Sequence, residues 1–148
     1  MKHHVLFVCT GNTCRSPLAE HLFKKAAAGR DIETSSAGTY ANADFPTPEP
    51  MVTVMQEEGI EGYTHRPRRL DTAMVEAATV ILAMAHEHKE NIVRNHPQAK
   101  DKTFLLMEFA AQGPKDIADP IGSGLETYRR CKDEIKTALA AVIRRLDN

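Results

Sequence analysis

Hydrophobic and polar positions follow two different rhythms along the chain. Apolar runs without polar alternation lie at 5–8, 80–82 and 103–107, and a weaker run lies at 32–36. Such runs are typical of strands that are buried on both faces of a sheet. Between them, apolar residues recur at the three- and four-residue spacing of helices, which predicts helices over 17–28, 47–58, 71–78, 86–95 and 124–146. Strands that alternate with helices predict an α/β fold, in which a mainly parallel sheet is covered by helices on both faces.

Capping residues place the ends of two of these helices. Ser16 followed by Pro17 predicts an N-cap with proline at the first helical position. Ser123 with Glu126 three residues later predicts a capping box at the start of the last helix. Two irregular stretches remain, at 37–46 and 112–122. Ligands of parallel sheets bind outside the carboxyl ends of the strands, so we expect a site where these stretches gather.

Composition and charge narrow the function classes. A length of 148 residues indicates a single domain, 1–148. Nineteen Lys and Arg against 20 Asp and Glu give a net charge of −1, so we expect no nucleic-acid partner. No apolar run approaches the ~20 residues of a membrane span, so we expect no membrane partner. An odd number of cysteines, three, does not indicate a disulfide framework, and the short first apolar run does not resemble a signal peptide; both favour the cytoplasm.

The first apolar run leads directly into a loop that carries the candidate chemistry. Cys9 and Arg15 are separated by five residues, Thr10, Gly11, Asn12, Thr13 and Cys14, between a buried strand and a helix start. Backbone N–H groups of such a loop and the helix N-terminus bind phosphate, and the same field stabilises a thiolate. Arg15 has the planar fork that grips a phosphoryl dianion. The pattern predicts a phosphate-binding loop with Cys9 as nucleophile; the alternative is that Cys9 only ends a strand as a small apolar residue.

A phosphocysteine route also needs an acid for the leaving group. Asp119 precedes Pro120 at the end of the second irregular stretch, and proline holds the residue before it extended. Asp119 is the favoured acid. Asp116 remains a competing candidate, and an ordinary Asp-Pro turn is the other interpretation.

The segment 5–20, with Val-Cys-Thr-Gly-Asn-Thr-Cys-Arg-Ser-Pro-Leu-Ala-Glu, resembles the low-molecular-weight protein-tyrosine-phosphatase family. The resemblance extends through 36–38, 80–85 and 119–120, and so spans essentially the whole chain. It implies a three-layer sandwich whose four-stranded parallel sheet has the order 2-1-3-4. It also implies no cofactor and no metal, with phosphorylated proteins as substrates and phosphate or another oxyanion in the loop.

The resemblance carries roles onto individual residues. Cys9 becomes the nucleophile, Arg15 the phosphate binder and Asp119 the general acid. Asn12, Ser16, Ser36 and His65 become a hydrogen-bonded support for the loop, with Ser16 near the Cys9 sulfur. Cys14 becomes the partner of Cys9 in a reversible disulfide that protects the nucleophile from over-oxidation; the alternative is a buried spacer thiol.

Two departures from the tyrosine-directed members bear on the substrate. Thr13 stands where those members carry a large aliphatic residue, and Ile121-Gly122 replaces tyrosines after the Asp-Pro pair. Threonine at this position resembles the bacterial protein-arginine phosphatases of the same family. A narrower, polar rim suits a guanidinium better than a phenol ring, so phosphoarginine is the expected substrate and phosphotyrosine the alternative. Tyr40, in the loop after the second strand, is a further candidate for the entrance.

Two other functions are alternatives to phosphatase activity. Arsenate reductase resembles this fold and loop, but it needs relay cysteines around the third strand, and residues 80–95 contain none. A non-catalytic phosphate-binding module would not need Cys9, Arg15 and Asp119 together. His86, Glu87 and His88 could suggest a metal site, but no further cluster of ligands accompanies them in the sequence. The three residues are therefore interpreted as the solvated start of a helix.

Overall fold

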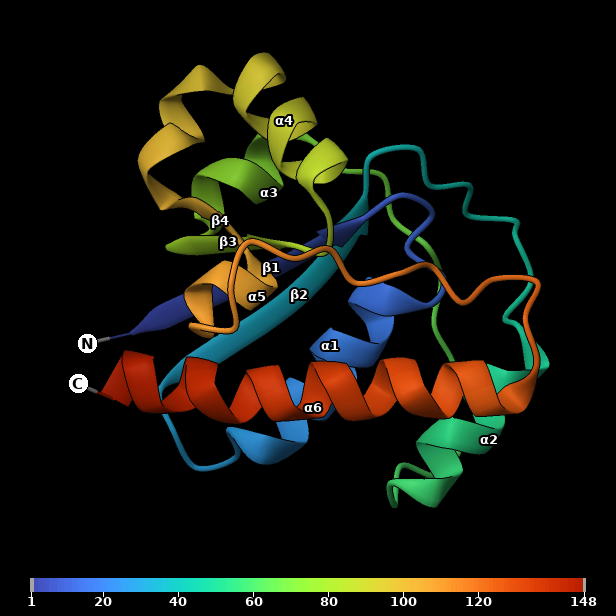
Figure 1. The fold of residues 1–148 in the computed structure, drawn as a ribbon. Coiled ribbons are helices and arrows are strands. Elements are labelled where there is room, and N and C mark those ends of the chain that lie inside the picture. The colour runs from blue at the N-terminus through green and yellow to red at the C-terminus, as the bar shows by residue number, and fades with distance from the viewer. Residues whose placement is uncertain (1, 148) are drawn as a thin grey trace.

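A computed structural model describes residues 2–147 and contains one parallel sheet (Figure 1). Its strands are β1 (His3–Cys9), β2 (Ile32–Gly38), β3 (Val80–Ala83) and β4 (Thr103–Leu105), and their order is β2-β1-β3-β4. All three pairings are parallel. The predicted α/β class and the strand order 2-1-3-4 are therefore confirmed.

Helices cover both faces of this sheet, which gives three layers (Figure 1). Alternate residues of β1 divide between the faces: Val5 and Phe7 pack into one apolar core, and Leu6 and Val8 into the other. The first face is covered by α1 (Arg15–Ala26), α2 (Glu49–Glu57), α5 (Leu106–Phe109) and α6 (Leu125–Asp147). The second is covered by α3 (Thr72–Ala77), α4 (His86–Asn95) and the 3-10 helix η1 (Pro97–Lys102).

Several predicted element boundaries differ from the structure by one or more residues, and three of these differences change how a side chain or an apolar run is used. Helix α1 begins at Arg15, with Cys14 at the N-cap, so Ser16 lies inside the helix and its hydroxyl is used elsewhere. Strand β4 ends at Leu105, and the next residues form the short helix α5, since an apolar run of this length fits a strand end or a buried helix equally well. Helix α6 begins at Leu125, so Gly124 rather than Ser123 directly precedes it.

The register of the sheet brings the functional segments together. Cys9 at the end of β1 pairs with Gly38 at the end of β2, and Val8 pairs with Ala83 at the end of β3. The segment before α6 crosses this same end of the sheet (orange in Figure 1), where the Ile117 N–H donates to the Met84 carbonyl at 2.8 Å. The loop after β1 and the segment before α6 therefore meet at the carboxyl ends of the strands.

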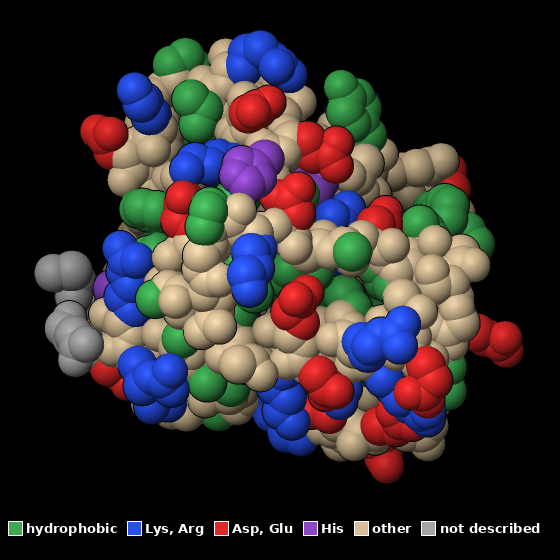
Figure 2. Space-filling model, viewed as in Figure 1, with side chains coloured by type: hydrophobic (Ala, Val, Ile, Leu, Met, Phe, Trp, Pro, Cys, Tyr) green, Lys and Arg blue, Asp and Glu red, His purple; other side chains and the backbone are tan. Residues whose placement is uncertain are grey.

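The surface carries acidic and basic side chains in mixed order, as Figure 2 shows for one face. Within residues 2–147, no helix combines the length and the hydropathy that crossing a membrane requires.

Candidate active site

The loop between β1 and α1 curls tightly against the end of β2. Asn12 has a φ of 56°, in the left-handed region that few residues other than glycine adopt. A Cβ atom at Gly38 would lie 2.4 Å from the Thr10 carbonyl oxygen and 3.0 Å from the Asn12 nitrogen. The backbone N–H groups of Thr39 and Tyr40 donate to the Cys9 and Thr10 carbonyls, both at 2.9 Å. Only glycine at position 38 allows this close approach.

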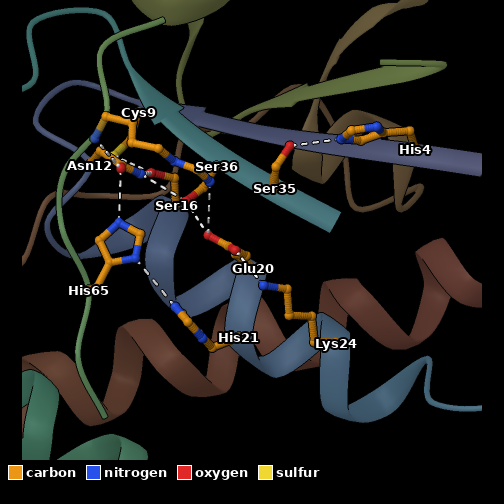
Figure 3. A network of polar contacts seen from close by, with 11 residues as sticks. His4, Cys9, Asn12, Ser16, Glu20, His21, Lys24, Ser35, Ser36 and His65 are labelled. Atoms are coloured by element: carbon orange, nitrogen blue, oxygen red, sulfur yellow. Dashed lines mark hydrogen bonds and ion pairs between the residues drawn. The ribbon is translucent and has the colours of Figure 1, made fainter. Parts of the chain in front are cut away.

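Asn12 is the centre of the support beneath the loop (Figure 3). Its amide nitrogen donates to the Ser16 and Ser36 hydroxyls at 2.8 and 2.9 Å. Its amide oxygen accepts from the Arg68 backbone N–H and from His65 Nε2, both at 2.9 Å. Asn12 is completely buried, and each of its two polar atoms makes two hydrogen bonds. The structure thus brings together the four predicted supporting residues, Asn12, Ser16, Ser36 and His65.

The Cys9 sulfur lies 2.9 Å from the Ser16 hydroxyl oxygen. Because that oxygen already accepts from Asn12, its hydrogen is free to point at the sulfur. A hydroxyl donor and the N-terminus of α1 both favour a negative charge on this atom. Such an arrangement can hold a thiolate and can stabilise it as a leaving group.

Arg15 joins the loop to the segment that carries Asp119. Its Nη1 donates to the Ile117 carbonyl at 2.9 Å, and its Nη2 lies 3.6 Å from Asp119 Oδ2. The Arg15 side chain is 6% exposed and that of Asp119 is 44% exposed. The Ile121 N–H donates to Asp119 Oδ1 at 3.1 Å and fixes the carboxylate at the mouth of the loop. Cys9, Arg15 and Asp119 therefore belong to one connected site.

Asp116, the competing acid, is bound to another part of the molecule. The His86 backbone N–H and its ring Nδ1 contact one Asp116 carboxylate oxygen at 2.8 and 2.6 Å. Burial raises the pKa of Asp116, but these hydrogen bonds outweigh it, so the pKa lies below its usual value. A carboxylate held in this way is poorly suited to deliver a proton over the loop, and the geometry favours Asp119.

The predicted rim residues do not share one cavity. Tyr40 is 67% exposed, lies beside Arg69, and borders a cavity of about 320 Å³ together with Thr10 and His88. Thr13 borders a different, much smaller cavity with Phe45 and His65. Ile121 is 42% exposed on the segment before α6.

Two buried partners of the loop escaped the sequence analysis. The Ser36 hydroxyl donates to Glu20 Oε1 at 2.5 Å, and Lys24 pairs with Glu20 Oε2 at 2.7 Å. His88 Nδ1 accepts from the Ala85 N–H, so His88 Nε2 donates to the Thr10 hydroxyl at 2.7 Å. Burial lowers the pKa of His88 to about 4, which keeps its ring neutral. No local pattern marks Glu20 or His88, because each meets the loop only through the fold.

Cys14 turns away from solvent at the end of the loop. Its sulfur lies 3.4 Å from the Tyr128 hydroxyl on α6, and burial raises the pKa of its thiol. Cys9, Cys14 and Cys131 are all buried and all free of disulfides. Burial also raises the pKa of Cys131, to about 12, and this residue packs in the apolar core beneath α6.

Comparison with known proteins agrees with this geometry. Residues 4–148 match the family model described as low molecular weight phosphotyrosine protein phosphatase. The match covers nearly the entire chain, so the protein belongs to this family. Its relatives carry the names of protein phosphatases, and the chain is accordingly a phosphatase enzyme.

Three similar proteins carry the names of either arginine or tyrosine phosphatases. The protein-arginine-phosphatase of Geobacillus stearothermophilus is 42% identical over 147 residues, which cover 99% of this chain and 97% of the relative. A YwlE arginine phosphatase structure, a cysteine-to-serine mutant with a phosphorylated active-site serine, has a TM-score of 0.93 at 33% identity and covers 98% and 96% of the two chains. A low molecular weight protein tyrosine phosphatase from T. tengcongensis has a TM-score of 0.91 at 38% identity, with 97% and 99% covered.

Proposed function

We propose that the chain, as a single domain of residues 1–148, removes the phosphoryl group from phosphoarginine in proteins through a phosphocysteine at Cys9. The observation that carries the proposal is the connected site of Cys9, Arg15 and Asp119 around a loop closed by Asn12. The phosphorylated active-site serine of the related YwlE mutant supports an intermediate at the nucleophile position.

The first half of the reaction transfers the phosphoryl group to sulfur. Cys9 Sγ attacks phosphorus while Arg15 and the backbone N–H groups of residues 10–14 bind the phosphoryl oxygens. The P–N bond breaks, and Asp119 gives its proton to the departing guanidine nitrogen. This half ends with phosphocysteine and ionised Asp119.

The second half regenerates the enzyme. Asp119 takes a proton from a water molecule, whose oxygen attacks phosphorus in line with the P–S bond. Inorganic phosphate forms, and Cys9 leaves as a thiolate that the Ser16 hydroxyl stabilises. The two steps balance with water and with side-chain and backbone groups of this chain.

The rim supports the choice of phosphoarginine. Thr13 brings a hydroxyl and little apolar surface, Ile121 replaces an aromatic ring, and Asp119 offers carboxylate oxygens to a guanidinium. The 42% identical relative named protein-arginine-phosphatase supports the same substrate. Thr13, Tyr40 and Ile121 are therefore the proposed specificity residues.

Tyrosine phosphatase activity is the second candidate, because the 38% identical T. tengcongensis structure is described as a protein tyrosine phosphatase. Side-by-side turnover of matched phosphoarginine and phosphotyrosine peptides distinguishes the two. We expect a higher kcat/KM for phosphoarginine; a higher value for phosphotyrosine would reverse the order of the candidates. The absence of relay cysteines from 80–95 argues against arsenate reductase.

We further propose that the partners are phosphorylated proteins, that phosphate or a related oxyanion occupies the loop, and that the protein works in the cytoplasm. Three free cysteines support a reducing compartment.

A further inference from the structure

Three potential metal ligands, one buried and two half-buried, meet beside the loop support. Glu20 and His21 are neighbours on α1, and His65 comes from the segment between α2 and α3. One ligand atom from each lies within 4.8 Å of the other two. His21 and His65 face each other in Figure 3, with Glu20 beside them. None of these three residues is among the proposed reacting groups, Cys9, Arg15 and Asp119.

Hydrogen bonds determine which nitrogen of His65 is available. The Arg68 backbone N–H can only donate, so the Asn12 atom that it contacts is the amide oxygen. His65 Nε2 contacts that same oxygen at 2.9 Å and must therefore carry a proton. In the neutral ring, Nδ1 then carries a lone pair, which accepts a hydrogen bond from His21 Nε2 at 3.3 Å.

The spacing of the two rings matches a tetrahedral metal site. His21 Nε2 and His65 Nδ1 are 3.3 Å apart. Zn–N bonds of about 2.0–2.1 Å in tetrahedral geometry place two nitrogens roughly 3.3–3.4 Å apart. The two rings stand at 87° to each other, and the ring of His21 is held edge-on by Tyr63. A metal ion would take the place of the bridging proton, and because it lies off the line between the two nitrogens, each ring turns by roughly 35° to direct its lone pair at the ion.

The charge of Glu20 and the exposure of its partners permit a metal ion to replace the proton between the two rings. Glu20 is ionised and only 4% exposed. Its ion-pair partners Lys24 and Arg68 have side chains that are 52% and 48% exposed, so both can turn toward solvent. Its third partner, the Ser36 hydroxyl, donates to Oε1 and can stay in place while Oε2 binds an ion.

We propose that Glu20, His21 and His65 form a binding site for a divalent transition-metal ion of the Zn²⁺ type, with water completing the coordination. His65 binds through Nδ1 and keeps its Nε2 proton on Asn12, in the manner of metal-bound histidines whose second nitrogen is hydrogen bonded. His21 binds through Nε2 and moves its proton to Nδ1, so no net proton is released from the rings. The ion connects α1 to the 63–69 segment and stabilises the loop support without contacting Cys9.

Equilibrium titration with Zn²⁺ tests the site in a Cys9→Ser background, which removes the competing thiolate of the loop. We expect one equivalent to bind and to raise the thermal midpoint. His21→Ala, which alters no residue of the proposed catalytic machinery, should weaken binding at least ~10-fold and remove the thermal shift. The matched control is His86→Ala, which removes a histidine paired with an aspartate on the other face of the sheet.

Three results would overturn the proposal: no stoichiometric binding, His21→Ala binding as tightly as its parent, or an equal loss in His86→Ala. Histidine ¹H–¹⁵N spectra give a measure that does not depend on a variant folding. Zn²⁺ should shift His65 Nδ1 while Nε2 stays protonated. Loss of the Nε2 proton would mean that the metal displaces Asn12, contrary to the proposed geometry.

Discussion

The sulfur of Cys14 lies 3.4 Å from the hydroxyl oxygen of Tyr128, so the end of the loop is fastened to the first turn of α6. Burial raises the pKa of this thiol, which makes Cys14 a poor nucleophile at rest. Its expected role as the disulfide partner of Cys9 therefore requires it to leave Tyr128 after Cys9 has been oxidised.

Peroxide should inactivate the enzyme reversibly through a Cys9–Cys14 disulfide. Attack of Cys14 on the sulfenic acid of Cys9 releases water and forms the S–S bond, which a thiol reductant then cleaves. Cys14→Ser should convert the inactivation into an irreversible one, measured as activity regained after dithiothreitol. Cys131→Ser is the matched control and should recover like the wild type. Full recovery of Cys14→Ser would leave Cys14 as a packing residue.

Asp119→Asn should slow substrates with poor leaving groups by roughly 10²–10⁴-fold, because the departing group loses its proton donor. An activated aryl phosphate leaves without a proton, so its turnover should change much less. Steady-state kinetics on the two substrates gives the comparison. Asp116→Asn serves as the control, since Asp116 is bound to His86, and a larger effect there would exchange the two assignments.

Thr13→Ile should raise phosphotyrosine turnover, lower phosphoarginine turnover and change their ratio of kcat/KM by more than ~10-fold. The reason is that an added apolar wall is worth about 10–200-fold to a ring, whereas the lost hydroxyl removes an acceptor for the guanidinium. Thr13→Ser keeps the hydroxyl and should preserve the preference for phosphoarginine. Parallel changes in both activities would show that Thr13 is only a spacer.

The protein should lose stability as the pH falls from about 6.5 toward 4. Burial lowers the pKa of both His65 and His88 to about 4 in the folded chain, from an ordinary value near 6.5. The unfolded chain therefore binds protons first, and the loss is complete below pH 4. Between these two pKa values, each histidine raises the equilibrium constant for unfolding by at most about tenfold for every unit by which the pH falls.

Urea denaturation between pH 7 and 4.5 measures this dependence. His88→Gln keeps a donor for Thr10 but removes the titrating ring, so its stability should fall less steeply than that of the wild type. A stability that is flat over this range would mean that the rings of His65 and His88 take up protons as readily in the folded chain as in the unfolded chain.

Gly38→Ala should reduce turnover and phosphate affinity together, because the added Cβ would collide with the Thr10 carbonyl and force the loop to move. We expect a loss of more than ~10-fold in kcat/KM and weaker competitive inhibition by phosphate. Gly124→Ala is the control, since a Cβ there meets nothing within 4 Å. Normal kinetics in Gly38→Ala would show that the loop tolerates displacement.

Local patterns were sufficient for the strands, most helices and the Cys9–Arg15 loop, because each depends on neighbours in sequence. Ser16 shows where they fail: its pairing with Pro17 indicated an N-cap, but the hydroxyl is used by Cys9 and Asn12. Neither Glu20 nor His88 shows its contact with the loop in the local sequence, and only the packing of α1 and α4 against the sheet brings them there. Tertiary hydrogen bonds of this kind leave no periodic signal.

Asn12 uses each of its polar atoms twice, so the conformational cost of shaping the phosphate cradle is met during folding rather than during each encounter with substrate. A phosphate-binding loop that is formed in advance recognises the phosphoryl group itself, whether that group is bound to the nitrogen of arginine or to the oxygen of tyrosine. In the proposed function, substrate choice then becomes separable from turnover, because the side chains of the proposed specificity residues Thr13, Tyr40 and Ile121 make none of the Asn12 hydrogen bonds. Variation at these three positions could redirect the enzyme among phosphorylated side chains while the chemistry beneath them stays intact.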